Sequence, residues 1–253
     1  MSWKSTDMPY FKFNEELSIN HNLCIVKKNT YKGAARDLTF TAVPGRSGDL
    51  ITDNNRYKNV KITYEVVALE ASTKDIPAIA RELKDWLLSK VGYFKLSDTY
   101  DPEFFRLASY ADEFDLEQEL SSMGRAKITF NCKPFKYWIY GQNEHTTTEK
   151  VLWLKNPYPF TALPYIRIKG NGDITLSLRD VKNGYSKQYH FKGVEEYIEI
   201  DSETMHAYKG SINENSKIYF MDFPQILPNC DGSLNVIEGD VDEITVIPRW
   251  RRL

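Results

Sequence analysis

TFTAVPGRSGDLITDNNRYKNVKITYEVVAL, residues Thr39–Leu69, is the stretch that decides how the first half of the chain is organised. Apolar and polar side chains alternate over Val60–Leu69, and β-branched and aromatic residues fill Thr39–Val43, so both segments predict strands. Pro44 and Gly45 end the first strand. We expect the two strands to pair with each other in the sheet of their own domain.

The segment between these strands, Pro44–Asn59, is far longer than a hairpin connection of about two to five residues. It is polar apart from Leu50 and Ile51. We interpret it as an arm that reaches away from its own domain and lies on a neighbouring subunit, with this apolar pair as its buried contact. The residues assigned to the subunit contact are Pro44, Gly45, Arg46, Gly48, Leu50, Ile51 and Tyr57.

The composition is that of an ordinary globular protein of one or two domains. With a net charge of −2, the chain has no excess of basic residues that would favour binding to a phosphate backbone. No run approaches the roughly 18 apolar residues of a membrane span, and the first residues lack the apolar core of a secretory signal. Cys24, Cys132 and Cys230 are widely spaced and odd in number. This pattern argues against a disulfide framework or a Cys-x-x-Cys metal site and favours a reducing cytoplasm.

A single helix is predicted, over about Ile76–Lys90, because apolar residues recur there at helical spacing. These residues are Ile76, Ile79, Ala80, Leu83, Trp86 and Leu87. Charged residues occupy the positions between them. We therefore expect the helix to bury one face against a sheet.

The polar segment Gly141–Lys150 has no apolar periodicity and predicts a linker between two domains, residues 1–140 and 151–253. Short strand patterns with turn signals between them, and no helix, predict a β-sandwich for the second domain. Gly170–Asp173 is predicted as the turn of a hairpin, and Asn183–Gly184 as another two-residue turn. The predicted fold class is therefore mainly β.

Motifs along nearly the whole chain resemble one family. They are VPGRSGDL, RYKNVKITYEV, DWLLSKVGYFKLSDTYDPEFFRLASY and MGRAKITFNCKPFKY in the first part, and LPYIRIKGNGDITLSL, YIEIDSETMHAYK, DFPQIL and ITVIPRWRRL in the second. In this order they resemble the distal tail proteins, often called Dit, of the long-tailed, non-contractile siphophages of Gram-positive bacteria. The similarity is greatest to the baseplate hub proteins of lactococcal phages. One departure is the loop PNCDGSLNVIEG after DFPQIL, which is longer than the Gly-Asn turn usual there.

The resemblance implies a structural protein that forms a hexameric ring hub at the distal end of the tail tube. An N-terminal β-sandwich with one α-helix and a projecting β-hairpin arm would build the ring. A C-terminal galectin-like, carbohydrate-module-like β-sandwich would point outward. The arm Pro44–Asn59 would be the ring-forming hairpin, and Arg46 would be a solvated turn residue, an interface anchor or a residue that lines the channel.

The resemblance also implies the partners. They are other copies of the chain in a homohexamer, the major tail or tube protein, the tail-associated lysin, and baseplate or receptor-binding proteins held by the C-terminal domain. Genomic DNA would cross the central channel only in transit, during ejection. The protein would be assembled in the host cytoplasm and reside at the tail tip of the virion, where it serves host attachment without a membrane partner.

The alternative interpretation of the second domain is a carbohydrate-binding module that recognises host cell-wall polysaccharide, because exposed aromatic side chains stack on sugars. The aromatic candidates are Trp153, Tyr158, Tyr165 and Tyr185. Trp153 lies in the apolar run VLWL, however, and is expected in the core. The run Arg249–Arg252 predicts a final strand with solvated arginines.

No motif predicts catalysis, a cofactor or a metal site. The four histidines lie in separate segments, without the local spacing of a metal site or a catalytic triad. Asp98 and Asp101 could suggest a Ca²⁺ loop, but a turn capped by its own side chains is the simpler interpretation. No spacing supplies the carboxylate pair of a glycosidase. We expect neither enzymatic activity nor a cofactor.

Overall fold

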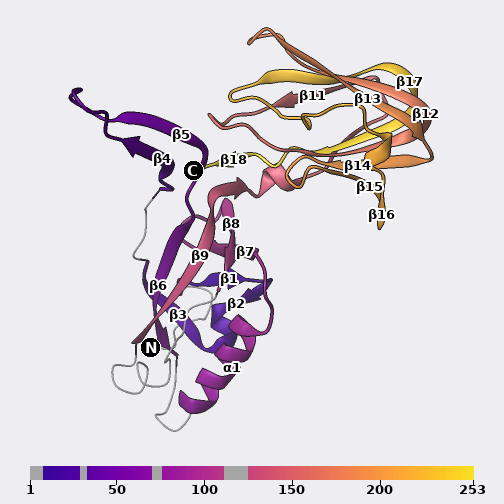
Figure 1. The fold of residues 1–253 in the computed structure, drawn as a ribbon. Coiled ribbons are helices and arrows are strands. Elements are labelled where there is room, and N and C mark those ends of the chain that lie inside the picture. Colours follow the sequence, from indigo (N-terminus) through magenta and orange to yellow (C-terminus); the bar gives the residue numbers. More distant parts are fainter. Residues whose placement is uncertain (1–7, 29–32, 70–75, 111–124) are drawn as a thin grey trace. The chain divides into compact units, whose positions relative to one another are not determined.

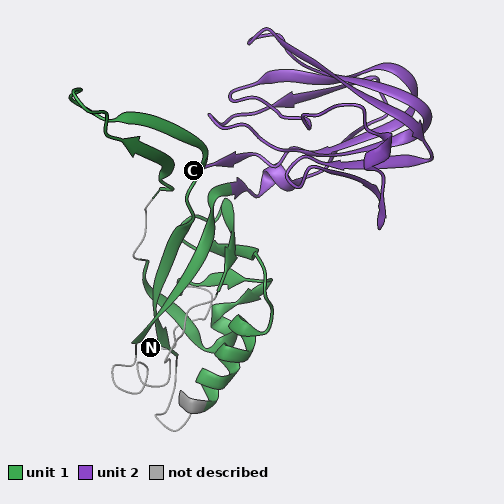
Figure 2. Cartoon of the chain, viewed as in Figure 1, with its two compact units in different colours: residues 1–136, 253 green, residues 137–252 purple. Residues whose placement is uncertain are grey.

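The computed structural model describes residues 8–28, 33–69, 76–110 and 125–253, without the side chains of residues 76 and 77. The chain divides into two compact units, residues 1–136 with 253 and residues 137–252 (Figure 2). Strands dominate both units, and the described residues contain one α-helix (Figure 1). The prediction of a mainly-β fold is confirmed. No helix in the described part is long and apolar enough to cross a membrane.

The first unit is built on one large sheet. Its strands lie in the order β2 (Glu16–Leu17), β1 (Phe11–Phe13), β7 (Phe94–Asp98), β8 (Phe104–Ser109), β9 (Arg125–Trp138), β6 (Val60–Ala68) and β3 (Leu23–Lys28). A short 3-10 helix, η2 (Ser18–His21), follows β2. Strand β6 buries Val60, Ile62, Tyr64 and Val66 on one face, as its alternating sequence predicts.

Aromatic rings fill the core of the first unit. Phe11 stacks on Tyr64 and on Trp86, with ring centroids 5.0 Å and 5.7 Å apart. Trp86 belongs to helix α1 (Ile76–Leu88), which ends two residues before the predicted end at Lys90. The helix buries Ile79, Ala80, Leu83, Trp86 and Leu87, which is the predicted apolar stripe as far as its side chains are described. Each large buried side chain contributes about 1.5–3 kcal/mol before entropy costs.

The strand pairing predicted for Thr39–Leu69 is wrong. Residues 39–41 belong to β4 (Arg36–Thr41), which pairs with β5 (Leu50–Tyr57) in a two-stranded sheet of its own, while β6 pairs with β3 and β9. The arm is therefore a β-hairpin over residues 36–57 rather than an excursion over residues 44–59. Most of β5 is polar and exposed, so it lacks the apolar alternation by which a strand is recognised in sequence.

The second unit is built on two long strands, β12 (Tyr165–Asp180) and β17 (Asp231–Ile247), which pair along most of their length. Their neighbours are β10 (His145–Thr147), β11 (Val151–Lys155), β13 (Tyr185–Val194) and β14 (Tyr197–Asp201). Beyond β14 the sheet continues with β15 (His206–Lys209) and β16 (Ile212–Asn213). The remaining elements are the 3-10 helices η3 (Tyr140–Gln142) and η4 (Asn215–Lys217) and the last strand, β18 (Arg251–Arg252).

Each long strand serves two sets of neighbours. The first half of β17 pairs with β11 and its second half with β10, while β12 pairs first with β14 and then with β13. The register shifts between the halves, beside Gly170 and Gly239. A Cβ on Gly170 would lie 2.1 Å from the Asp240 carbonyl oxygen, so only glycine permits this approach of the two backbones.

This geometry corrects the hairpin predicted at Gly170–Asp173. The glycines there mark a bulge inside β12, where two strands approach closely, instead of a reversal of the chain. The turn predicted at Asn183–Gly184 is present between β12 and β13, with Gly184 at a φ of 63°.

The segment expected to be a linker, Gly141–Lys150, is instead part of the second unit. Gly141 is buried, and β10 pairs with β17, His145 opposite Val246. A short edge strand is held by backbone hydrogen bonds and can carry polar side chains, so it leaves no periodic signal. Trp153 also departs from expectation, because it is 72% exposed instead of lying in the core.

Candidate functional site

The hairpin formed by β4 and β5 is exposed along most of its length. Phe40 lies directly opposite Ile51, and each is 59% exposed. Opposite residues share a face of a β-hairpin and successive residues alternate, so this pair forms an apolar patch on one face. Leu50, opposite Thr41 and 50% exposed, lies on the other face. Both faces of the hairpin thus carry apolar side chains in water.

An isolated two-stranded hairpin is at best marginally stable in water. This one forms its own sheet, separate from the large sheet of the first unit, and in Figure 2 it extends away from the other green elements. Contiguous exposed apolar residues on such an element mark an interaction site. The hairpin is therefore the candidate functional site of the first unit.

Polar contacts hold the base of the hairpin. Arg56 Nε donates to Asp37 Oδ2 at 2.6 Å, and this hydrogen bond, from a guanidinium, lowers the pKa of Asp37 below its ordinary value. Arg36 donates to Asp53 at 2.7 Å and to the Tyr57 hydroxyl at 3.0 Å. These contacts fix the base of the hairpin, where the chain enters and leaves it, whereas Phe40 and Ile51 lie nearer the turn and stay mostly exposed.

A glycine-containing turn joins the two strands. Gly45 and Gly48 have φ angles of 76° and 89°, a backbone region that side chains with a Cβ rarely adopt. The Arg46 amide donates to the Val43 carbonyl at 3.1 Å and closes the turn. Arg46 is exposed there, and its role in a subunit contact stays a prediction.

The structure brings the sequence-predicted contact residues into one hairpin but gives them different environments. Four of them form the exposed turn: Pro44, Gly45, Arg46 and Gly48. Leu50 and Ile51 begin β5, whereas Tyr57 lies at the base, where its ring packs edge-on against Phe135. Sequence reasoning missed Phe40, because its membership of the apolar patch depends on the register that sets it opposite Ile51.

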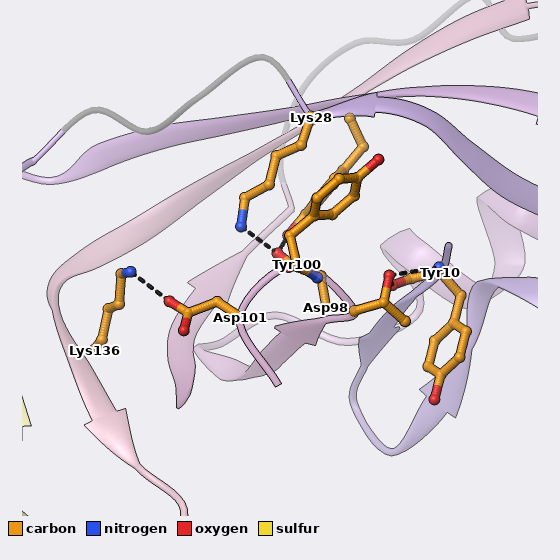
Figure 3. A network of polar contacts seen from close by, with 8 residues as sticks. Tyr10, Lys28, Asp98, Tyr100, Asp101 and Lys136 are labelled. Carbon is orange, nitrogen blue, oxygen red and sulfur yellow. Dashed lines mark hydrogen bonds and ion pairs between the residues drawn. The ribbon is translucent and has the colours of Figure 1, made fainter. Parts of the chain in front are cut away.

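The polar network around Asp98 is the second place where functional groups gather in this unit (Figure 3). Asp98 accepts hydrogen bonds from Lys28 Nζ at 2.7 Å, the Tyr64 hydroxyl at 2.6 Å and the Tyr100 amide at 2.9 Å. Burial, with Asp98 beside it, holds the pKa of Tyr64 well above its ordinary value. The network borders a cavity of about 190 Å³.

The contacts of this network indicate a structural role. Asp98 caps the turn through the Tyr100 amide, and Lys28 and Lys136 pair with Asp98 and Asp101 respectively. The two carboxylates considered for Ca²⁺ are thus engaged by lysines from β3 and β9, which join the β7–β8 turn to the sheet. The described residues contain no group of three or more histidine, cysteine or acidic side chains placed to hold a metal ion.

A comparison with family models and a comparison with solved structures both find phage proteins. The model of the phage tail protein RIFT-related domain matches residues 7–132. SPP1 Dit (gp 19.1), a paradigm of the hub adsorption apparatus in phages that infect Gram-positive bacteria, superposes with a TM-score of 0.71 at 14% identity, covering 98% of this chain and 100% of that chain.

Two structures of the phage P2 baseplate in its activated conformation are also similar. The form with Ca gives a TM-score of 0.54 at 13% identity and covers 94% of this chain and 97% of that chain. The form with Sr gives 0.54 at 13% identity and covers 97% and 98%. No curated protein matched in the sequence comparison.

The structural similarities show the fold of the whole chain, and the domain model matches its first unit. The predicted resemblance to phage tail hub proteins is thereby confirmed. The chain belongs to the family of phage tail proteins that carry this RIFT-related domain.

Proposed function

We propose that this chain is the structural hub of a siphophage tail tip and that it assembles into a closed ring of six copies through the hairpin Arg36–Tyr57. The observation that carries the proposal is the apolar pair Phe40 and Ile51, exposed on an element that has no core of its own. The family match and the whole-chain fold similarity to a tail hub protein support it.

The ring follows from the kind of contact that the hairpin can make. A projecting element on one side of a subunit meets a different surface of the next subunit, which is a heterologous contact. Such contacts either close into a ring or continue as a filament. Burying Phe40 and Ile51 against the next copy would contribute about 1.5–3 kcal/mol for each fully buried side chain.

In the proposed assembly the first unit builds the ring, and the second unit holds baseplate or receptor-binding proteins. The ring joins the tail tube to the tail-associated lysin, and DNA crosses its central channel during ejection. The role is structural and not catalytic. Assembly takes place in the host cytoplasm, and the mature location is the tail tip of the virion.

The test is the mass and the shape of the purified full chain. Native mass spectrometry over a range of concentrations should give a discrete closed oligomer, and negative-stain images should show a six-fold ring. Deleting the hairpin tip, residues 39–52, and joining the ends with a short Gly-Ser linker should return the protein to monomers. A wild-type protein that stays monomeric at every concentration, or a ring that survives the deletion, would overturn the proposal.

A further inference from the structure

Trp153 is the most informative side chain of the second unit, because it is 72% exposed while both of its neighbours in β11 pack inward. Removing a large apolar side chain of this kind from water normally stabilises a fold by about 1.5–3 kcal/mol or more. The fold forgoes that stabilisation. Exposed tryptophans recur where proteins bind other molecules.

The residues beside Trp153 form a polar face on the sheet of β11, β17, β12 and β13. Trp153 is in register with Ser233 of β17, Arg179 of β12 and Ser186 of β13. The next row on the same face contains Val151, Asn235, Ser177 and Gln188, and His190 lies opposite Thr175. The side chains between these positions, among them Leu176, Leu178 and Leu234, are buried in the core.

A second exposed aromatic residue closes the far side of this face. The Tyr219 amide donates to the His190 carbonyl at 2.9 Å, so Tyr219 lies beside β13. Its ring is 55% exposed and packs with Lys192, whose Nζ is 4.5 Å from the ring centroid. Lys192 alternates with Phe191, which is buried, and so shares the outer face with His190.

The two aromatic residues are therefore separated by a polar floor. Four strand spacings of about 4.8 Å put the backbone at Tyr219 roughly 19 Å from β11. Ser177 and Ser233 are small and buried, and Asn235 Nδ2 donates to the Ser233 hydroxyl at 3.0 Å. The floor is thus shallow and already ordered.

We propose that this face, from Trp153 to Tyr219, binds a glycan chain of pyranose rings. The apolar face of a pyranose ring stacks on an indole or phenol ring, and its hydroxyl groups need donors and acceptors. Arg179 and Gln188 supply them in planar groups with fixed geometry, whereas Asn235 Nδ2 is already hydrogen-bonded to Ser177 and Ser233. The serines beside Trp153, Ser177, Ser186 and Ser233, favour a glycan over a protein partner, because serine is depleted in protein interfaces relative to the rest of the surface.

The test uses the full chain and an array of neutral cello-, malto- and chito-oligosaccharides of increasing length, with polyglycerol phosphate as an anionic comparison. The longest oligosaccharide that binds is then titrated calorimetrically. We expect saturable binding that strengthens with chain length. Trp153→Ala and Tyr219→Ala should each weaken it at least tenfold, without a change in thermal midpoint.

Tyr140→Ala is the matched control, because Tyr140 is 60% exposed but lies in η3, outside this face; its affinity should equal that of wild type. Ring assembly should be unaffected by all three substitutions, which separates this test from that of the hairpin. The proposal is overturned if no neutral oligosaccharide binds, if the Trp153 and Tyr219 variants bind as wild type does, or if Trp153→Ala abolishes only the binding of another tail protein.

Discussion

The double substitution Phe40→Ser with Ile51→Ser replaces both residues of the exposed apolar pair. It should prevent ring assembly while the subunit stays folded. Each side chain is 59% exposed in the single chain. If the neighbouring copy covers these exposed parts, each contributes about 1–2 kcal/mol, in proportion to the 1.5–3 kcal/mol of a fully buried side chain. The pair then contributes about 2–4 kcal/mol to each subunit contact.

At about 1.4 kcal/mol for each tenfold change, this loss weakens every contact roughly thirtyfold to several hundredfold. A closed ring assembles only when all its subunit contacts form, and each contact is weakened. The protein concentration at which rings form should therefore rise by at least the factor by which one contact is weakened. Sedimentation velocity at a series of protein concentrations measures this shift. Far-UV circular dichroism and the thermal midpoint should stay close to those of wild type, because neither side chain is part of the core.

The matched control is Val91→Ser, which removes a fully exposed apolar side chain elsewhere in the first unit (Val91 is 103% exposed). It should assemble as the wild type does. If the double variant and wild type form rings over the same concentration range, the apolar pair is not the subunit contact and the argument from its exposure fails. A double variant that unfolds would show that the pair stabilises the subunit itself.

Three further outcomes are expected. Asp201→Asn should lower the free energy of unfolding by about 2 kcal/mol, measured with urea, because Arg249 loses the carboxylate that it contacts at 2.7 Å and 2.9 Å; an unchanged midpoint would contradict this. Burial opposes ionisation of Asp201, but the hydrogen bonds and the charge of Arg249, together with the amides of Glu203 and Thr204, outweigh burial and hold the pKa of Asp201 below its ordinary value. The resulting stabilisation is complete above the unfolded carboxyl pKa of about 3.9 and is lost as pH falls through the lower folded-state pKa. Urea midpoints measured through this acid range should therefore fall more steeply for wild type than for Asp201→Asn, and parallel profiles would refute the assignment. Gly170→Ala, whose Cβ would lie 2.1 Å from the Asp240 carbonyl oxygen, should cost more than about 3 kcal/mol. Gly184→Ala has no atom within 4 Å and only an unfavourable φ, so it should cost about 1–2 kcal/mol in thermal denaturation; equal losses would count against the close approach at Gly170.

Local patterns were sufficient wherever a single element buries one face. The apolar stripe from Ile79 to Leu87 predicted α1, and the apolar–polar alternation from Val60 to Val66 predicted β6. Both were predictable because the spacing of apolar residues that marks a helix or a strand repeats within one short segment. The turn at Asn183–Gly184 was predictable for the same reason. The resemblance of whole motifs, read in order, identified the family before any fold was known.

Exposure at the candidate sites could not be predicted in this way. Trp153 lies in an apolar run and was expected in the core, yet it lies on the outer face of β11 and is mostly exposed. Arg249 was expected in water, yet it pairs with Asp201, a residue far away in sequence. Both outcomes depend on which segments pack together, and neither segment carries that information by itself.

The chain's own sequence thus determined its mainly-β character, its helix, its tight turn and its family. The tertiary structure alone decided that Thr39–Thr41 pairs with Leu50–Thr52, that Phe40 joins Ile51 in one exposed patch, and that Trp153 faces solvent. The physical reason is that strand pairing is made by hydrogen bonds between backbones that all residues share. Register is then chosen by the packing of the whole unit, so a polar strand such as β5 becomes visible only when its partner is in place.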